Sequence, residues 1–294
     1  MFLLNNILDV YEIPFINIPK FIFEYYAECH KILNDKNYKI VKNIFNTTED
    51  KKIFDLIFKR RLNILTDADI QKYYNKKYYS SSCQSRIIKE QYLDKINKSK
   101  VQYFLDLGFN SGFNAIAYNR LLPNLKKIYA FEVIYDVCKK SYIECFLEHN
   151  KIELIQKAVG ENVSKAKFYI NINNPNASMA DFSISAKREQ LINQNIHKEI
   201  DVDVTSIDVY CRENNIQPDF IKMDIEGSEL PALKGGIYTI KKFRPQLAIS
   251  IYHSDKDFIE IPLYLKNNLE NYEFKIGHYA PDIYETVLYA IPCF

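Results

Sequence analysis

Two glycines and a nearby carboxylate form the pattern in this 294-residue chain that is best suited to chemistry. The chain contains only seven glycines, where an average usage of roughly 7% would give about twenty, yet Gly108 and Gly112 share one five-residue loop. Glu132 follows twenty residues later. Glycine lets a ligand approach the main chain, and N–H groups at a helix start are free to face it. A carboxylate placed like Glu132 can bind ribose hydroxyls, so the pattern indicates a nucleotide site.

The spacing inside the loop separates two classes of cofactor. A dinucleotide fingerprint G-x-G-x-x-G that begins at Gly108 requires glycine at positions 110 and 113, where the chain has Asn110 and Phe113. A phenylalanine at the third position would prevent the close helix–strand packing of dinucleotide-binding proteins. The loop therefore favours a cofactor without a diphosphate. An ordinary strand–turn–helix without a ligand remains the structural alternative.

Three more ionisable residues stand near the ends of apolar runs. Asp106 ends the run before the glycine loop, and Asp224 and His253 follow two later runs. Ligands of open α/β sheets bind beyond the carboxyl ends of the strands, so we expect these residues to lie near Glu132. Taken singly, each also has an ordinary explanation as a turn cap, a helix cap or a hydrogen-bonded loop histidine.

The elements that must position these residues alternate between strands and helices, which predicts an α/β doubly wound sheet. Strands are expected at residues 103–106, 128–131, 152–156, 167–172, 201–205, 220–223, 246–252, 272–276 and 286–291. Helices are expected at residues 114–122, 135–149 and 261–269, and after a cap at Ser206. We expect residues 173–185 to form a polar loop long enough to cover a site.

The first third of the chain has a different character. Residues 1–95 lack glycine, and we expect a mainly helical N-terminal region ahead of a cofactor-binding domain at residues 96–294. Thr47 and Asp50 match a capping box that starts a helix. The tract QKYYNKKYYSSS at residues 71–82 interleaves tyrosine with lysine, which suits stacking on bases or sugars. We favour half-buried packing or a mobile lid for this tract over nucleic-acid binding.

Composition gives little sign of a nucleic-acid partner, a secreted protein or a membrane protein. The net charge is +2 with a pI near 8.0, below the value above about 9 expected of a dedicated nucleic-acid-binding domain. The six cysteines contain no C-x-x-C pair and indicate free thiols in a reducing compartment. No signal peptide is recognisable and no apolar run approaches the length of a membrane span. We therefore expect a cytoplasmic protein without a transmembrane segment, either monomeric or a homo-oligomer.

Several segments carry a resemblance to a known family. Asp106-Leu107-Gly108-x-x-x-Gly112 resembles the first motif of S-adenosylmethionine-dependent methyltransferases. The segment FIKMDIEGSELPALKGG at residues 220–236 resembles the signature of FkbM-type methyltransferases, as do YAFE at 129–132, KAVG at 157–160, LAISIYH at 247–253 and the segment at 278–290. The similarity covers about residues 95–294, with a weaker match to a helical leader at 40–95. Phe109 departs from the family pattern, which usually has a small residue there, and is expected to narrow the loop.

The resemblance implies a Rossmann-like methyltransferase fold, in which a mostly parallel seven-stranded sheet has its last strand antiparallel. It implies S-adenosylmethionine as cofactor and methylation of hydroxyl oxygens in sugars, glycans or secondary metabolites. The cofactor contacts that it implies come from the loop, the second strand and the turn after the third strand: Asp106, Gly108, Asn110, Ser111, Gly112, Glu132, Val133 and Ala158.

On the acceptor side, the predicted catalytic residues are His253, Asp224 and Glu226. His253 or Asp224 would act as general base, since histidine titrates near working pH. We expect no metal. In an alternative version, Asp224, Glu226 and His253 bind Mg²⁺ or another divalent ion that lowers the pKa of the acceptor hydroxyl. Mixed oxygen and imidazole ligands suit a transition metal better than Mg²⁺.

The sequence thus predicts an S-adenosylmethionine-dependent O-methyltransferase that acts on a hydroxyl of a sugar, glycan precursor or other small metabolite. One alternative is an RNA methyltransferase that uses the tyrosine–lysine tract. Another is a dinucleotide-dependent sugar oxidoreductase, which retains Glu132 but must explain Asn110 and Phe113. No motif in the chain names the acceptor.

Overall fold

The computed structural model describes residues 35–73, 91–110, 112, 118–134, 151–171, 197–280 and 282–293. Four sequence predictions lie wholly or largely outside these residues: the cofactor contact of Ser111, the tyrosine–lysine tract beyond Tyr73, the helix at 135–149 and the polar loop at 173–185.

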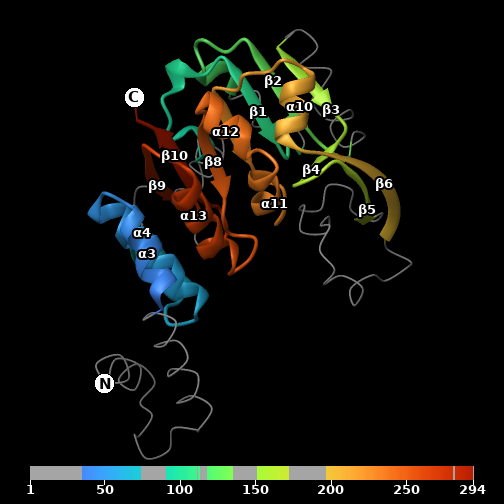
Figure 1. The fold of residues 1–294 in the computed structure, drawn as a ribbon. Helices are drawn as coiled ribbons and strands as arrows, with labels where there is room; N and C mark the ends of the chain where they lie inside the picture. The colour runs from blue at the N-terminus through green and yellow to red at the C-terminus, as the bar shows by residue number, and fades with distance from the viewer. Residues whose placement is uncertain are drawn as a thin grey trace, which may run out of the picture.

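A seven-stranded sheet forms the centre of the fold (Figure 1). Its strands are β1 (Tyr103–Leu107), β2 (Lys127–Phe131), β3 (Ile152–Ile155), β7 (Phe220–Met223), β8 (Gln246–Ser250), β9 (Tyr272–His278) and β10 (Thr286–Pro292). They lie in the order β3-β2-β1-β7-β8-β10-β9, and β10 runs antiparallel to both neighbours while the other pairs are parallel. The prediction of a Rossmann-like sheet with an antiparallel last strand is therefore confirmed. The strand order reverses between β1 and β7, the topological switch point where such sheets bind ligands.

Alternate residues of the central strands point to opposite faces, and both faces are buried. Leu105 of β1 and Ile221 of β7 join one core together with residues of four helices, whereas Phe104 and Phe220 join a second core on the other face. Burial on both faces explains why these strands read as continuous apolar runs. The four helices on the first face are α10 (Ile207–Glu213), α11 (Glu229–Lys234), α12 (Ile237–Phe243) and α13 (Asp257–Asn268). None of the helices in the described ranges has the length and apolar character needed to cross a membrane.

The N-terminal helices pack against the far edge of this sheet. They are α3 (Lys36–Ile44), α4 (Thr48–Arg61) and α5 (Asp67–Tyr73), and Figure 1 shows the first two beside α13 and β9. Thr47 caps α4 as predicted, accepting the N–H of Asp50 at 3.0 Å. Asp50 in turn accepts the N–H of Ile276 in β9 at 3.2 Å, and Phe54 stacks on Phe258 of α13. The described part of the N-terminal region therefore shares the main core, and the proposed boundary near residue 95 stays a prediction.

A smaller sheet stands beside the carboxyl ends of β2 and β3. It contains β4 (Ala158–Val159), β6 (His197–Thr205) and β5 (Ser164–Asn171), in that order. Its inner face contributes Ala158 and Phe168 to an apolar cluster that also contains Val133. The strands expected near 167–172 and 201–205 are present, but they belong to this separate sheet. Ser206 then caps α10 as predicted.

Candidate active site

The loop after β1 is held by the end of β2. The N–H groups of Gly108 and Phe109 both donate to the carbonyl of Phe131, at 3.1 and 2.9 Å, and the N–H of Asn110 donates to Glu132 Oε2 at 2.7 Å. The expectation that N–H groups here face a ligand is wrong for these three, because they donate to Phe131 and Glu132 at the end of β2. A diphosphate bound at this loop would need free backbone N–H groups as hydrogen-bond donors, and these three N–H groups are already engaged.

The two glycines of the loop are required by the protein's own packing. Gly108 has φ +87°, and a Cβ atom there would lie 1.9 Å from the carbonyl oxygen of Asp224. Gly112 has φ +77°, and a Cβ atom there would meet the ring of Phe109 at 2.6 Å. Phe109 is 6% exposed and belongs to the second core. The Phe109 ring packs in this core and against Gly112 of the loop, and the narrowing of the cofactor loop by Phe109 stays a prediction.

Glu132 stands at the end of β2 and is 3% exposed. Besides the N–H of Asn110, its carboxylate accepts the N–H of Ile134 at 3.0 Å. Burial raises the pKa of Glu132, and these backbone hydrogen bonds oppose the rise. A carboxylate has about four lone-pair positions, so the group retains capacity for further donors.

A pocket opens beside Glu132 at the switch point. It encloses about 440 Å³ of non-atom space, part of it open to solvent. Of the predicted residues, Gly108, Glu132, Val133, Ala158 and Glu226 line it. The sequence analysis missed six lining residues: Phe131, Lys157, Val159, Phe168, Ile225 and Ser228. Asp106, Asn110 and Gly112 lie near the pocket but outside this lining.

Asp106 lies inside β1 and is buried with Lys222 of β7. Lys222 Nζ is 3.0 Å from Asp106 Oδ1, and the two side chains are 4% and 3% exposed. The same ammonium donates to the carbonyls of Leu107 and Gly108. Burial raises the pKa of Asp106, while the charge of Lys222 opposes the rise. Asp106 thus acts on the loop through Lys222, which binds the loop carbonyls. Lys222 is a site residue that the sequence analysis missed, although a lysine inside an apolar strand was an available signal.

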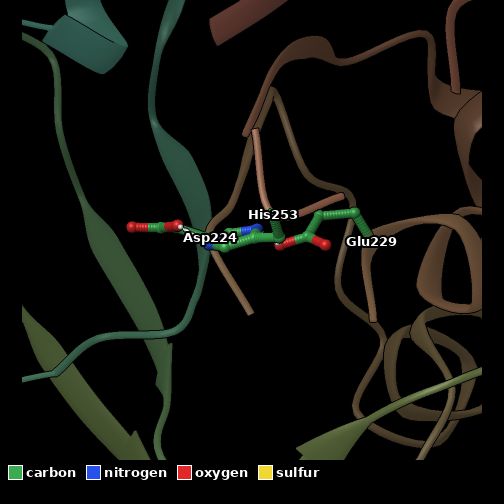
Figure 2. Close-up of side chains that lie close together, drawn as sticks. All are labelled: Asp224, Glu229 and His253. Carbon is green, nitrogen blue, oxygen red and sulfur yellow. Dashed lines mark ion pairs between the residues drawn. The ribbon is translucent and has the colours of Figure 1, made fainter. Parts of the chain in front are cut away.

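His253 brings three carboxylates together on the other side of the switch point, and Figure 2 shows it with two of them, Asp224 and Glu229. Its Nε2 is 3.3 Å from Asp224 Oδ1 and 3.4 Å from Glu226 Oε2, and its Nδ1 is 3.0 Å from Glu229 Oε1. We call these four residues the carboxylate–histidine cluster. The structure therefore brings together the three predicted catalytic residues and adds Glu229.

Charge in the cluster determines the protonation of its members. Burial alone would lower the pKa of His253, but its contacts with Asp224 and Glu229 raise that pKa to about 11. Burial would likewise raise the pKa of Asp224, but His253 and Lys222 hold it well below its usual range. Tyr92 and Tyr252 also donate to Asp224, at 2.9 and 3.1 Å. A protonated imidazole and a weakly basic carboxylate are poor proton acceptors, so this geometry disfavours both as the general base at neutral pH.

Glu229 organises the loop between β7 and α11. It is fully buried and accepts the N–H of Ile225 at 2.8 Å and that of Gly227 at 2.9 Å. Between them Glu226 adopts φ +56°, a left-handed conformation that is strained for a residue with a side chain. In this conformation Glu226 both lines the pocket and faces His253. An acid in the first turn of a helix was the sequence signal for Glu229.

The sheet order is that of the Rossmann-like methyltransferase fold. The profile of the Methyltransferase FkbM domain matches residues 106–276, and the chain belongs to this family of S-adenosylmethionine-type methyltransferases. The methyltransferase FkbM from Methylobacillus flagellatus KT has a similar structure, with a TM-score of 0.64 at 20% identity. The match covers 86% of this chain and 58% of that protein, so this chain spans less than two thirds of its length.

More distant solved structures also match. Fibrillarin from Aeropyrum pernix, solved with natively bound S-adenosyl-L-methionine, gives a TM-score of 0.39 at 14% identity over 70% of this chain and 73% of that chain. A precorrin-6y C5,15-methyltransferase from Geobacter metallireducens gives 0.38 at 11% identity over 74% and 92%. No curated protein gives a significant match to the sequence.

Proposed function

We propose that the chain is an S-adenosylmethionine-dependent O-methyltransferase whose acceptor is a hydroxyl group of a sugar, glycan precursor or other small metabolite. Its family performs methyl transfer. The observation that carries the choice of cofactor is Glu132, which lines the pocket beyond β2 while its loop is already closed by hydrogen bonds.

The pocket residues fit an adenosyl group. Glu132 would bind the ribose hydroxyls, and Val133 and Ala158 would contact the adenine. The N–H groups of Gly108, Phe109 and Asn110 are engaged by β2, so this part of the loop has no cradle for a diphosphate. These contacts favour an adenosyl sulfonium over a dinucleotide, and they count against the oxidoreductase alternative.

The cofactor supplies a methyl group that its positive sulfur has already activated. The protein must then align the acceptor oxygen and surround the reacting atoms with suitable charge. Glu226 lines the pocket, and Asp224 lies next to it in the same loop. The negative charges of Asp224 and Glu226 favour the positively charged sulfur of the cofactor on this side of the pocket. We propose that Asp224, Glu226 and His253 orient the acceptor hydroxyl, and that alignment contributes most of the rate enhancement. The oxygen–methyl bond forms as the methyl–sulfur bond breaks, and solvent water takes up the hydroxyl proton.

Transfer of a carbon-13 methyl group tests this function. The protein would be incubated with methyl-labelled S-adenosylmethionine and separate pools of neutral sugars, amino sugars, nucleotide sugars and short RNA. The proposal expects a new carbon signal with the shift of a methyl ether in at least one sugar pool. A methylamine signal, or labelling confined to RNA, would contradict O-methylation of a small acceptor.

A further inference from the structure

The carboxylate–histidine cluster carries more negative charge than its own imidazole can balance. Asp224, Glu226 and Glu229 all lie within 3.4 Å of a His253 ring nitrogen. Even with His253 protonated, three carboxylates against one imidazolium leave a net charge of −2 within the cluster. The charge of Lys222 also acts on Asp224, but its ammonium pairs with the buried carboxylate of Asp106 at 3.0 Å. Glu229 is fully buried and the side chain of Asp224 is 25% exposed. Buried excess charge of this kind is costly unless a cation accompanies it.

The carboxylates of Asp224 and Glu229 have hydrogen-bond donors from outside the cluster. Each Asp224 oxygen accepts a tyrosine hydroxyl, and each Glu229 oxygen accepts a backbone N–H. Both ring nitrogens of His253 are buried and have no partner with hydrogen-bond geometry among the residues that the structure describes. The His253 side chain is only 9% exposed and lies between Asp224 and Glu229 (Figure 2).

The spacing of the ligand atoms suits a metal ion. One ligand atom each from Asp224, Glu229 and His253 lies within 4.8 Å of the others. Metal–ligand bonds of about 2.0–2.2 Å place neighbouring ligands roughly 3–4 Å apart. His253 meets Asp224 through Nε2 at 3.3 Å and Glu229 through Nδ1 at 3.0 Å, so an ion bound by one of these ring nitrogens must draw the other carboxylate closer. The tyrosine and backbone donors on the two carboxylates resemble the outer contacts that orient metal ligands.

We propose that Asp224, Glu229 and His253 bind a divalent transition-metal ion, with Glu226 facing it from the pocket side. One imidazole with carboxylates favours Mn²⁺, Fe²⁺ or Zn²⁺ over Mg²⁺. Combined with the proposed function, such an ion would contact the acceptor hydroxyl and make it easier to deprotonate. That role rests on the proposed function, whereas metal binding itself does not.

The test is a titration of the whole chain, freed of metal by chelation, with Mn²⁺ alone. The free-ion electron paramagnetic resonance signal reports uptake, and competition with Zn²⁺ and Mg²⁺ reports selectivity. We expect one saturable site that prefers Zn²⁺ to Mg²⁺. His253→Gln should weaken Mn²⁺ binding by at least about tenfold. Asp255→Asn removes an acid only two residues away, whose side chain is 80% exposed, and should leave the affinity within about twofold.

Glu226→Gln provides a second variant, in the loop between β7 and α11. Circular dichroism checks that each variant folds. It should weaken Mn²⁺ binding by less than His253→Gln does. The proposal is overturned if neither Mn²⁺ nor Zn²⁺ shows saturable uptake, or if binding survives His253→Gln and Glu226→Gln unchanged. Calorimetry with S-adenosylhomocysteine on the metal-free protein tests the cofactor separately, so the two proposals fail independently.

Discussion

The main chain of Gly108 lies directly against that of Asp224, because a Cβ atom on Gly108 would be only 1.9 Å from the Asp224 carbonyl oxygen. This contact joins the cofactor loop after β1 to the loop after β7. The two halves of the proposed site are therefore positioned by one backbone contact that only glycine allows.

The first prediction follows from this contact. Gly108→Ala should lower the free energy of unfolding by about 3 kcal/mol or more, because the new methyl group meets main chain and the φ of +87° is strained for alanine. Gly160→Ala is the control, since its Cβ would meet only a valine methyl group at 3.2 Å. Urea unfolding measures both. Equal losses for the two variants would mean that the Gly108 contact has no special role.

The buried pair of Lys222 and Asp106 gives a second prediction. Lys222→Met should cost about 3–5 kcal/mol of stability, because it leaves the carboxylate of Asp106 buried without its partner. Adding Asp106→Asn should restore part of this loss. A double-mutant cycle measured by urea unfolding would show the coupling. Strictly additive losses would show that the pair does not explain the cost.

The protonation of His253 is the third prediction. In the metal-free protein its pKa, raised to about 11 by Asp224 and Glu229 against the effect of burial, keeps the ring doubly protonated from about pH 6 to about pH 9. Burial instead lowers the pKa of His278 to about 3, so that ring stays neutral. Nitrogen-15 NMR of labelled histidine, assigned with His253→Gln and His278→Gln, reads both states. A His253 signal that titrates near pH 6.5 would contradict the ion-pair description.

The same shift sets a pH dependence of stability. The folded pKa of His253 lies above its unfolded value of about 6.5, so its stabilising contribution is complete below about pH 6.5. That contribution is lost as the pH rises toward about 11. The difference in unfolding free energy between the wild type and His253→Gln should therefore shrink as the pH is raised from neutrality.

Arg61 of α4 gives the fourth prediction. Its buried guanidinium donates to the carbonyls of Tyr252 and Ile283, at 2.7 and 3.1 Å, and pairs with Asp255 at 2.8 Å. Lysine cannot reproduce this planar fork, so Arg61→Lys should cost about 2–4 kcal/mol. Arg60→Lys, at a more exposed ion pair, should cost less than about 1 kcal/mol. Thermal and urea unfolding measure the loss of stability in both variants. Similar small losses would mean that Arg61 of α4 does not fix the loop beside His253.

Much of the fold could be predicted because its signals are local. The β7 strand ends at Met223 and Asp224 follows it, as the apolar run indicates. Ser206 and Thr47 cap helices because a hydroxyl beside free N–H groups acts within one turn. The family signature identified the class of enzyme, and the matching domain confirmed it.

The rest of the site depends on contacts between residues far apart in sequence. Lys222 lies 116 residues beyond Asp106, and Arg61 reaches loops about 190 residues later. The apolar strand around Lys222 is a local signal that this lysine is buried, but nothing local identifies the partner of either side chain. The direction of the Phe109 ring is likewise decided by which core has room for it, and this is a property of the assembled fold.

Calorimetric titration with S-adenosylhomocysteine tests the central claim most directly. The account predicts saturable one-to-one binding, weakened about ten- to a hundredfold in Glu132→Gln, since a charge-assisted hydrogen bond contributes about 1.5–3 kcal/mol. Glu153→Gln, on the exposed side of the adjacent strand β3, should bind as the wild type does. NAD should produce no binding heat. A protein that binds NAD and gives no response to S-adenosylhomocysteine would contradict the account.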